Sequence, residues 1–305
     1  MLLIVEQLLN GLQLGVMLFL LSAGLTLVFG IMQLINLAHG SLYMVGAYVT
    51  ATVAGASGSF VLGLLCGVVA AAMVGLAIEA LALRRLYDRD HLDQVLATFG
   101  IILTANEATK MIWGAQALFL DTPDILKGTV ELLPGLPYPL YRLAIIGAGL
   151  LVALGLFLLI TRTRTGMRLR AGALNREILS GLGVDVDRLF TLVFALGAGL
   201  AGLAGALAGP LLAIQVGMGE DILILAFVVI IVGGVGSVRG ALYGAILVGL
   251  VDTLGRAFLP SVMREVLAPG IADAVGASLA GIGIYLFMAL VLIWRPTGLF
   301  PAKTG

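Results

Sequence analysis

The side chains that could carry chemistry are few, and most of them interrupt long apolar runs. A charged or amide group at membrane depth is energetically expensive, so it usually faces the interior of a helix bundle. Such a group then belongs to a pathway or to a contact between helices. The candidates are Asn36, His39, Glu79, Asn106, Glu107, Gln215 and Asp252. Glu79 and Asp252 lie near the ends of their apolar runs, where we expect water to reach them.

No enzymatic site can be assembled from the motifs of this chain. The sequence contains no G-x-x-x-x-G-K-[ST] loop, no H-E-x-x-H motif and no G-x-S-x-G motif. Two histidines and the single cysteine, Cys66, are too few for a metal site or an internal disulfide. The G-x-G-x-x-G pattern at 197–202 follows no predicted strand, so we interpret it as helix packing. We predict no catalytic residue, no metal and no cofactor bound by this chain.

The polar residues that we single out surround an interruption, NLAHGS, at positions 36–41. The residues predicted to line a pathway through the membrane are Asn36, His39, Gly40, Asn106 and Glu107. Two other interpretations stay open. His39 lies near the cytoplasmic surface and bonds a carbonyl group, or Asn106 and Glu107 pair with a neighbouring subunit.

A second interruption, GGVGSVRG, occupies positions 233–240. Non-helical backbone at membrane depth is tolerated only where protein or a water-filled cavity satisfies its hydrogen bonds. Paired interruptions in the two halves of a chain are typical of transporter binding sites. The sequences HGSLY at 39–43 and RGALY at 239–243 are similar, which is compatible with an internal repeat. Tight helix packing, or a turn at the membrane surface, is the alternative for both interruptions.

A basic segment, 162–188, separates two apolar runs and contains six arginines. Such a short basic segment is expected on the cytoplasmic side. Its apolar residues at 167, 171, 174 and 178 recur at helical spacing, which predicts a helix with one apolar face. Thr165 is the expected N-cap, and Gly181 and Gly183 are the expected stop. The face either docks on a cytoplasmic partner or lies on anionic headgroups.

The composition excludes a water-soluble fold. The 305-residue chain is 61% hydrophobic and 11% charged, with a mean hydropathy of +1.14, whereas soluble domains carry about 25% charge. The net charge of zero indicates no nucleic-acid partner. The first basic residue is Arg84, so we expect no cleavable signal peptide. The 42 glycines lie mostly in apolar runs, where they allow helices to approach closely.

These patterns predict an all-α integral membrane protein, a polytopic bundle of about 8–9 transmembrane segments with broken helices. We expect a single domain over 1–305, with an exterior loop at 114–142 that is rich in proline and acidic residues. Twelve of the seventeen Lys and Arg residues fall on the predicted cytoplasmic side. If every segment crosses the membrane, the N-terminus is outside. If one interrupted segment is re-entrant, the N-terminus is inside.

Four ordered blocks carry a resemblance to a known family. They are GLTLVFGIMQLINLAHGSLYMVGAY at 24–48, LATFGIIL at 96–103, TGMRLRAGALNREILSGLGVDVDR at 165–188 and GGVGSVRGALYGAILVG at 233–249. Together they resemble the permease of branched-chain amino acid ABC transporters, in particular its H-type subunit, over nearly the whole chain. One departure concerns the fourth span, where Asn106 and Glu107 stand in place of the family's usual Gln-Asn pair.

The resemblance implies a bacterial inner-membrane protein that works with several partners. These are a second, homologous permease, two cytoplasmic ATPases that bind the ATP, and a periplasmic solute-binding protein. It implies that the segment at 162–188 couples to the ATPases, through Arg170, Ala171, Asn175, Gly181 and Gly183. The implied solutes are branched-chain or other small hydrophobic amino acids, and relatives import urea, amides or aromatic acids. A stand-alone channel, or an ion-coupled carrier that uses Glu107 or His39, is the rival interpretation, and a membrane enzyme has no nucleophile to support it.

Overall fold

The computed structural model describes residues 2–32, 34–87, 89–174 and 176–301. This part of the chain is mainly helical, which confirms the all-α fold expected from composition. Its α-helices are α1 (Leu2–Met32), α2 (His39–Ser57), α3 (Phe60–Leu81), α4 (His91–Trp113), α5 (Leu140–Arg162), α6 (Arg164–Leu174), α7 (Arg176–Gly181), α8 (Val186–Ala208), α9 (Met218–Gly233), α10 (Val238–Met263) and α11 (Pro269–Trp294). Shorter elements are η1 (Leu83–Leu86), η2 (Asp124–Leu126), β1 (Thr129–Leu133) and β2 (Leu136–Pro139).

Seven of the described helices are long and apolar enough to cross a membrane, namely α1, α3, α4, α5, α8, α10 and α11. The two remaining predicted segments form α2 and α9. Helix α9 has 16 residues, which corresponds to about 24 Å, whereas the hydrocarbon core is about 30 Å thick. The prediction of about eight or nine segments is therefore approximate, because α2 and α9 are less than full apolar spans.

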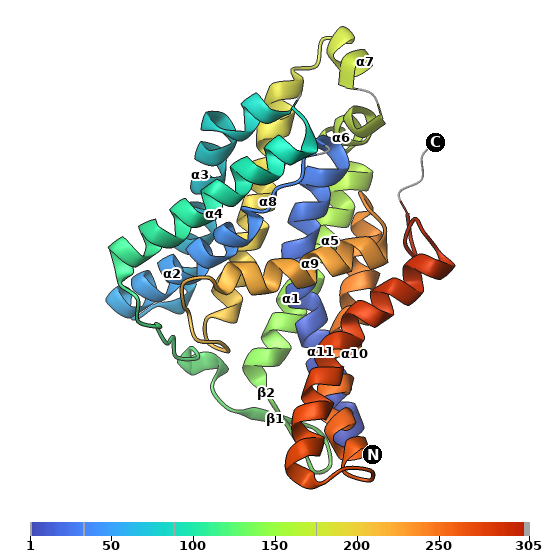
Figure 1. The fold of residues 1–305 in the computed structure, drawn as a ribbon. Helices are drawn as coiled ribbons and strands as arrows, with labels where there is room; N and C mark the ends of the chain where they lie inside the picture. The colour runs from blue at the N-terminus through green and yellow to red at the C-terminus, as the bar shows by residue number, and fades with distance from the viewer. Residues whose placement is uncertain (1, 33, 88, 175, 302–305) are drawn as a thin grey trace.

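Helix α1 forms the centre of the bundle (Figure 1). It is 31 residues long and apolar on all sides, and most of its spanning stretch is buried. A helix without a polar face has to be surrounded by other helices or lipid. Here α10, α8, α5 and α9 surround it.

Glycines set the closest helix contacts, as expected from their abundance in apolar runs. A Cβ atom on Gly15 of α1 would lie 2.8 Å from the carbonyl oxygen of Ala245 in α10. A Cβ atom on Gly46 of α2 would overlap with backbone atoms of Gly202 in α8. The backbones can touch only because these side chains are missing. The GAGLAG stretch at 197–202 is accordingly packing surface, as predicted.

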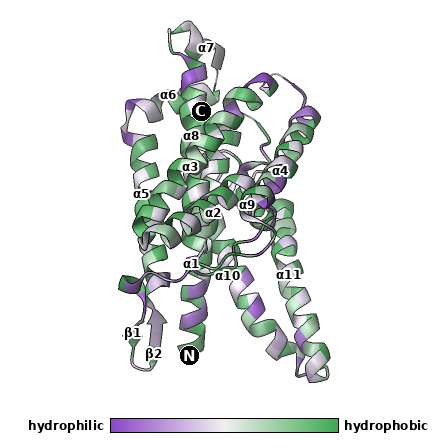
Figure 2. Ribbon diagram, turned by 90° about the vertical axis from the view of Figure 1, so that its left-hand side faces the viewer, coloured by the Kyte–Doolittle hydropathy of each residue, from purple (hydrophilic) through white to green (hydrophobic). Residues whose placement is uncertain are grey.

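The two ends of the bundle differ. The N-terminal turns of α1 lie beside the hairpin of β1 and β2, where the Tyr138 hydroxyl donates to Asn10 Oδ1 at 3.1 Å. Helices α6 and α7 lie at the opposite end (Figure 1). In Figure 2, hydrophilic residues gather at these ends and the helices between them are mainly hydrophobic. The N-terminus thus shares the side of the predicted exterior loop, as expected if all nine segments cross.

The predicted exterior loop at 114–142 contains η2 and the two-stranded hairpin, and α5 begins within its last residues at Leu140. Its first part pairs with the link between α8 and α9, because Leu118 and Ile214 exchange backbone hydrogen bonds of 2.8 and 2.9 Å. Gln215 is exposed in that link, outside the helices in which intramembrane polar residues were sought. The loop is therefore an ordered cover on this side of the bundle.

Candidate functional site

The break between α1 and α2 places a histidine and an amide deep in the protein. Asn36 and His39 are both fully buried. The Nε2 atom of His39 lies 3.2 Å from the carbonyl oxygen of Leu21, in the middle of α1. His39 therefore bonds a carbonyl group, as one interpretation expected, and it does so as a fully buried side chain inside the bundle.

Several buried polar atoms at this break have no hydrogen-bond partner within the described residues. They are both polar atoms of Asn36 and the Nδ1 atom of His39. A buried polar group left unpaired costs about 1–3 kcal/mol, and such groups are rare unless water, a ligand or a functional role explains them. These unpaired atoms are compatible with the predicted pathway role of Asn36 and His39, which stays a prediction.

An aliphatic cluster lies next to these polar groups. Leu25 of α1 packs with Leu223 and Ile230 of α9, and Leu37 from the break packs against them. Leu37 follows Asn36 directly in the chain. Unpaired polar groups and a buried aliphatic cluster are thus neighbours at the break.

Two of the predicted pathway residues, Gly40 and Asn106, both contact the start of helix α9. A Cβ atom on Gly40 would overlap with the carbonyl oxygen of Gly219, so the starts of α2 and α9 touch. The next residue, Glu220, accepts a hydrogen bond of 2.7 Å from the Asn106 amide in α4. Glu220 is not among the polar candidates singled out from the sequence. An acidic residue in the first turn of a short, otherwise apolar helix was the signal that could have identified it.

Glu107 lies apart from this group. Its side chain is 68% exposed and pairs with Lys110 of the same helix at 2.6 Å. Neighbouring positions on a helix point in different directions, so Asn106 faces α9 while Glu107 faces outward. Asn36, His39 and Gly40 lie together at the break, and Asn106 is connected to them through the start of α9. A role of Glu107 in the pathway stays a prediction.

The second interruption is a tight turn between α9 and α10. Gly234 and Gly236 adopt positive φ angles of 107° and 76°, and the Ser237 hydroxyl caps α10 by accepting from the Gly240 amide at 3.0 Å. A Cβ atom on Gly30 near the end of α1 would lie 2.6 Å from the Cα atom of Gly236. These contacts favour the packing interpretation for GGVGSVRG over a pathway-lining role.

The basic segment is helical over α6 and α7, on either side of residue 175, in keeping with the predicted helix. Asn175, at the junction, lies outside the described residues. The N-cap is Thr163, whose hydroxyl accepts from the Gly166 amide at 3.0 Å, and not Thr165 as predicted. Thr163 is the better cap because α6 begins one residue later, at Arg164.

Two residues of the predicted apolar face, at 167 and 174, point away from the bundle, and the side chain at 178 lies outside the described residues. Met167 and Leu174 of α6 are 61% and 68% exposed, and Ala171 between them is half-buried. The opposite face of α6 is buried through Gly166, Leu169 and Gly172. An exposed apolar stripe on a basic helix is typical of a surface that meets a protein partner or anionic headgroups.

The other predicted coupling residues have defined structural roles. Arg170 is an exposed residue of α6. Its guanidinium donates to the carbonyl oxygen of Ile160 at 2.6 Å and so connects α6 to the end of α5. Helix α7 ends at Gly181, and Gly183 follows with a φ of +81°. The Gly183 amide donates to the carbonyl oxygen of Ser180 at 2.9 Å, so the glycine stop is as predicted.

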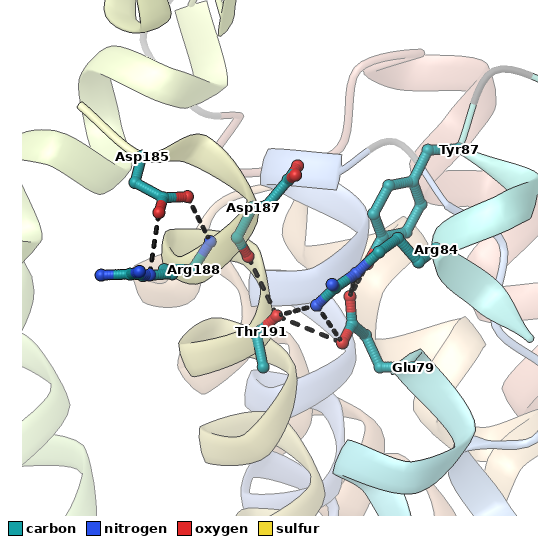
Figure 3. A network of polar contacts seen from close by, with 7 residues as sticks. All are labelled: Glu79, Arg84, Tyr87, Asp185, Asp187, Arg188 and Thr191. Carbon is teal, nitrogen blue, oxygen red and sulfur yellow. Dashed lines mark hydrogen bonds and ion pairs between the residues drawn. The ribbon is translucent and has the colours of Figure 1, made fainter. Parts of the chain in front are cut away.

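A buried carboxylate joins the end of α3 to the start of α8 (Figure 3). Glu79 is fully buried, so the expectation that water reaches it is wrong. It accepts hydrogen bonds from Arg84 at 3.2 Å, from the Tyr87 hydroxyl at 2.7 Å and from the Thr191 hydroxyl at 3.2 Å. These donors replace water. Asp252 is likewise buried and pairs with Arg256 at 2.7 Å.

The environment of Glu79 shifts the pKa values of its neighbours. Burial, and then the hydrogen bond to Glu79, raises the pKa of the Tyr87 hydroxyl above its usual range. The hydrogen bond and the charge of Glu79 raise the pKa of the Arg84 guanidinium. The cluster is thus an ion pair plus two neutral hydroxyl donors. It lies at the α6 end of the bundle.

Comparison with known proteins then decides the family. The family of branched-chain amino acid transport system permease components matches residues 7–292. The chain belongs to this family. A relative from Pseudomonas aeruginosa, the high-affinity branched-chain amino acid transport system permease protein BraD, is 30% identical, and the alignment covers 96% of this chain and 94% of the relative. The corresponding protein LivH of Escherichia coli K12 is 27% identical over the same shares of both chains.

The probable branched-chain amino acid transport permease protein LivH of Methanocaldococcus jannaschii is 31% identical, over 80% of this permease and 79% of the relative. No solved structure matches the permease. The family and the seven apolar helices establish a multi-pass protein of the bacterial inner membrane.

Proposed function

We propose that this permease is the membrane half of an ATP-driven importer for branched-chain or other small hydrophobic amino acids. The observation that carries the proposal is the exposed apolar face of α6, at Met167 and Leu174, on the basic end of the bundle. In a permease that worked alone, only lipid headgroups would be left to cover this face. A cytoplasmic ATPase that receives α6 in a groove would cover it.

The proposed assembly contains a second, similar permease, two ATPase subunits and a periplasmic solute-binding protein. ATP binds to the ATPases, because this chain carries no phosphate-binding loop. Movement of the ATPases displaces α6 and α7. The bundle then opens alternately to either side, around the broken helix that contains Asn36 and His39.

The solute class follows from the chemistry of the break. The unpaired atoms of Asn36 and His39 can bond the charged main-chain groups of an amino acid. Leu25, Leu223 and Ile230 provide an apolar surface for an aliphatic side chain. Urea and short amides, the alternative solutes, would make no use of this cluster. This contrast supports a hydrophobic amino acid as the solute.

Co-purification tests the proposed docking. A tagged permease, expressed with its genomic neighbours, should retain ATPase subunits. Arg170→Glu should reduce the retained ATPase at least about tenfold, because it reverses a charge on α6 and repels the carbonyl oxygen of Ile160. Lys127→Glu is the matched control, since Lys127 is an exposed cation in the exterior loop. Equal retention by Arg170→Glu and the wild type would contradict docking through α6.

Transport in liposomes tests the rival interpretation of a channel or ion-coupled carrier. Solute flux through the permease alone, without ATP, would favour that interpretation. The exposed pair of Glu107 with Lys110 speaks against it, because a coupling carboxylate is expected to be shielded inside the bundle.

A further inference from the structure

We infer that Gln94 and Glu79 are positioning residues that transmit movement of the coupling segment to the α1–α2 break. The inference rests on the proposed function. Two polar junctions connect the start of α8 to Ile35, which directly precedes Asn36. We call this route the polar relay. It consists of Thr191, Arg84, Glu79, Tyr87 and Gln94, together with the backbone of the turn that contains Leu86 and Arg89.

The first junction joins α8 to the turn after α3. Thr191 lies in the second turn of α8, and it bonds both Glu79 and Arg84, at 3.2 and 2.7 Å (Figure 3). Arg84 and Tyr87 come from the turn itself and hold the same carboxylate. Helix α8 begins just after α7, and Asp185 caps it by accepting from the Arg188 amide at 3.0 Å. A displacement of α7 therefore pulls on the start of α8, and through Thr191 on the turn.

The second junction joins that turn to the broken helix. Gln94 is 2% exposed. Its Nε2 atom donates to the carbonyl oxygens of Leu86 and Arg89, at 3.1 and 3.2 Å. Its Oε1 atom accepts from the amide of Ile35 at 3.3 Å. One side chain thus uses both ends of its amide to join the turn that contains Leu86 and Arg89 to Ile35, which lies 59 residues before Gln94.

The hydrogen bonds of the relay constrain the relative positions of the helices more tightly than the surrounding apolar packing does. Apolar contacts between helices allow small sliding movements, whereas a hydrogen bond with defined partners fixes one register. Replacing a buried ion pair with apolar side chains is often neutral or stabilising, so stability alone does not account for Glu79. Thr98 offers the contrast. It is fully buried on α4, and within the described residues its hydroxyl bonds only the α4 carbonyl oxygens of Gln94 and Val95.

The test is the number of solute molecules imported per ATP hydrolysed by the complete importer in proteoliposomes. Gln94→Met keeps the side-chain length and removes both ends of the bridge. We expect import per ATP to fall about fivefold or more, the scale of a typical coupling free energy, while ATP hydrolysis continues. Thr191→Val, which removes the hydroxyl of the first junction, should shift the ratio in the same direction. Thr98→Val is the matched control and should keep the wild-type ratio.

Three outcomes would overturn the relay. One is a wild-type ratio in both Gln94→Met and Thr191→Val. Another is an equal loss in Thr98→Val, which would mean that any change in α4 uncouples the importer. If Gln94→Met does not assemble, Thr191→Val decides alone, and a wild-type ratio there rejects the relay. A wild-type complex that imports nothing with ATP would reject the proposed function itself, which is a separate result.

Discussion

Replacing Asn36 with leucine should make the permease more stable and less active. Asn36 is fully buried, and neither polar atom of its side chain has a partner within the described residues. Each unpaired buried group costs about 1–3 kcal/mol. Leucine is similar in size and has no polar atom to pair. The free energy of unfolding should therefore rise by at least about 1 kcal/mol, while solute import falls because the site loses its hydrogen-bonding groups.

The assay combines thermal unfolding of the purified importer with solute uptake in proteoliposomes. A gain of 1 kcal/mol corresponds to roughly 2 °C or more in the melting temperature. Gln94→Met is the control, and its stability should change in the opposite direction. That amide is equally buried but bonded at both ends, so its loss should lower the stability by about 1–3 kcal/mol.

Two results would refute this reasoning about Asn36. If Asn36→Leu imports the solute as fast as the wild type, the side chain lies outside the pathway. If the variant is less stable than the wild type, the side-chain amide of Asn36 has hydrogen-bond partners in the resting protein, and the cost of unpaired atoms does not apply. Added solute should stabilise the wild type and leave Asn36→Leu unchanged, because a ligand stabilises only the protein that binds it.

Two further predictions concern the framework around the site. Gly46→Ala should lower the free energy of unfolding by about 1–3 kcal/mol relative to Gly55→Ala on the same helix. The reason is that a Cβ atom at Gly46 meets the backbone of Gly202, whereas one at Gly55 meets nothing within 4 Å. Equal melting temperatures of the two variants would contradict the packing argument. The raised pKa of Tyr87 favours its neutral form in the folded protein, so its contribution is complete below about pH 10 and is lost as the pH rises further. In Tyr87→Phe the alkaline loss of stability should be smaller, and an unchanged alkaline profile in pH-dependent melting would count against the hydrogen bond to Glu79.

Much of this permease follows from local patterns in the chain. Charge is too scarce for a soluble surface, so the membrane fold could be predicted from composition alone. The break at NLAHGS and the stop at Gly181 and Gly183 are set by residues close together in sequence. The exposed face of α6 was visible as a repeat of apolar residues, because helical spacing depends on nothing beyond the helix itself.

The contacts that form the site depend instead on the three-dimensional packing of the helices. Gln94 reaches Ile35 across 59 residues, and Glu79 reaches Thr191 across 112. Helix α1 is apolar on every side, so its sequence does not indicate which neighbour each face will meet. Partner choice was decided by glycine contacts such as Gly15 with Ala245, where backbones approach closely enough to exclude other arrangements. Glu79 is buried for the same reason, since packing brings Arg84, Tyr87 and Thr191 to a carboxylate that would otherwise need water.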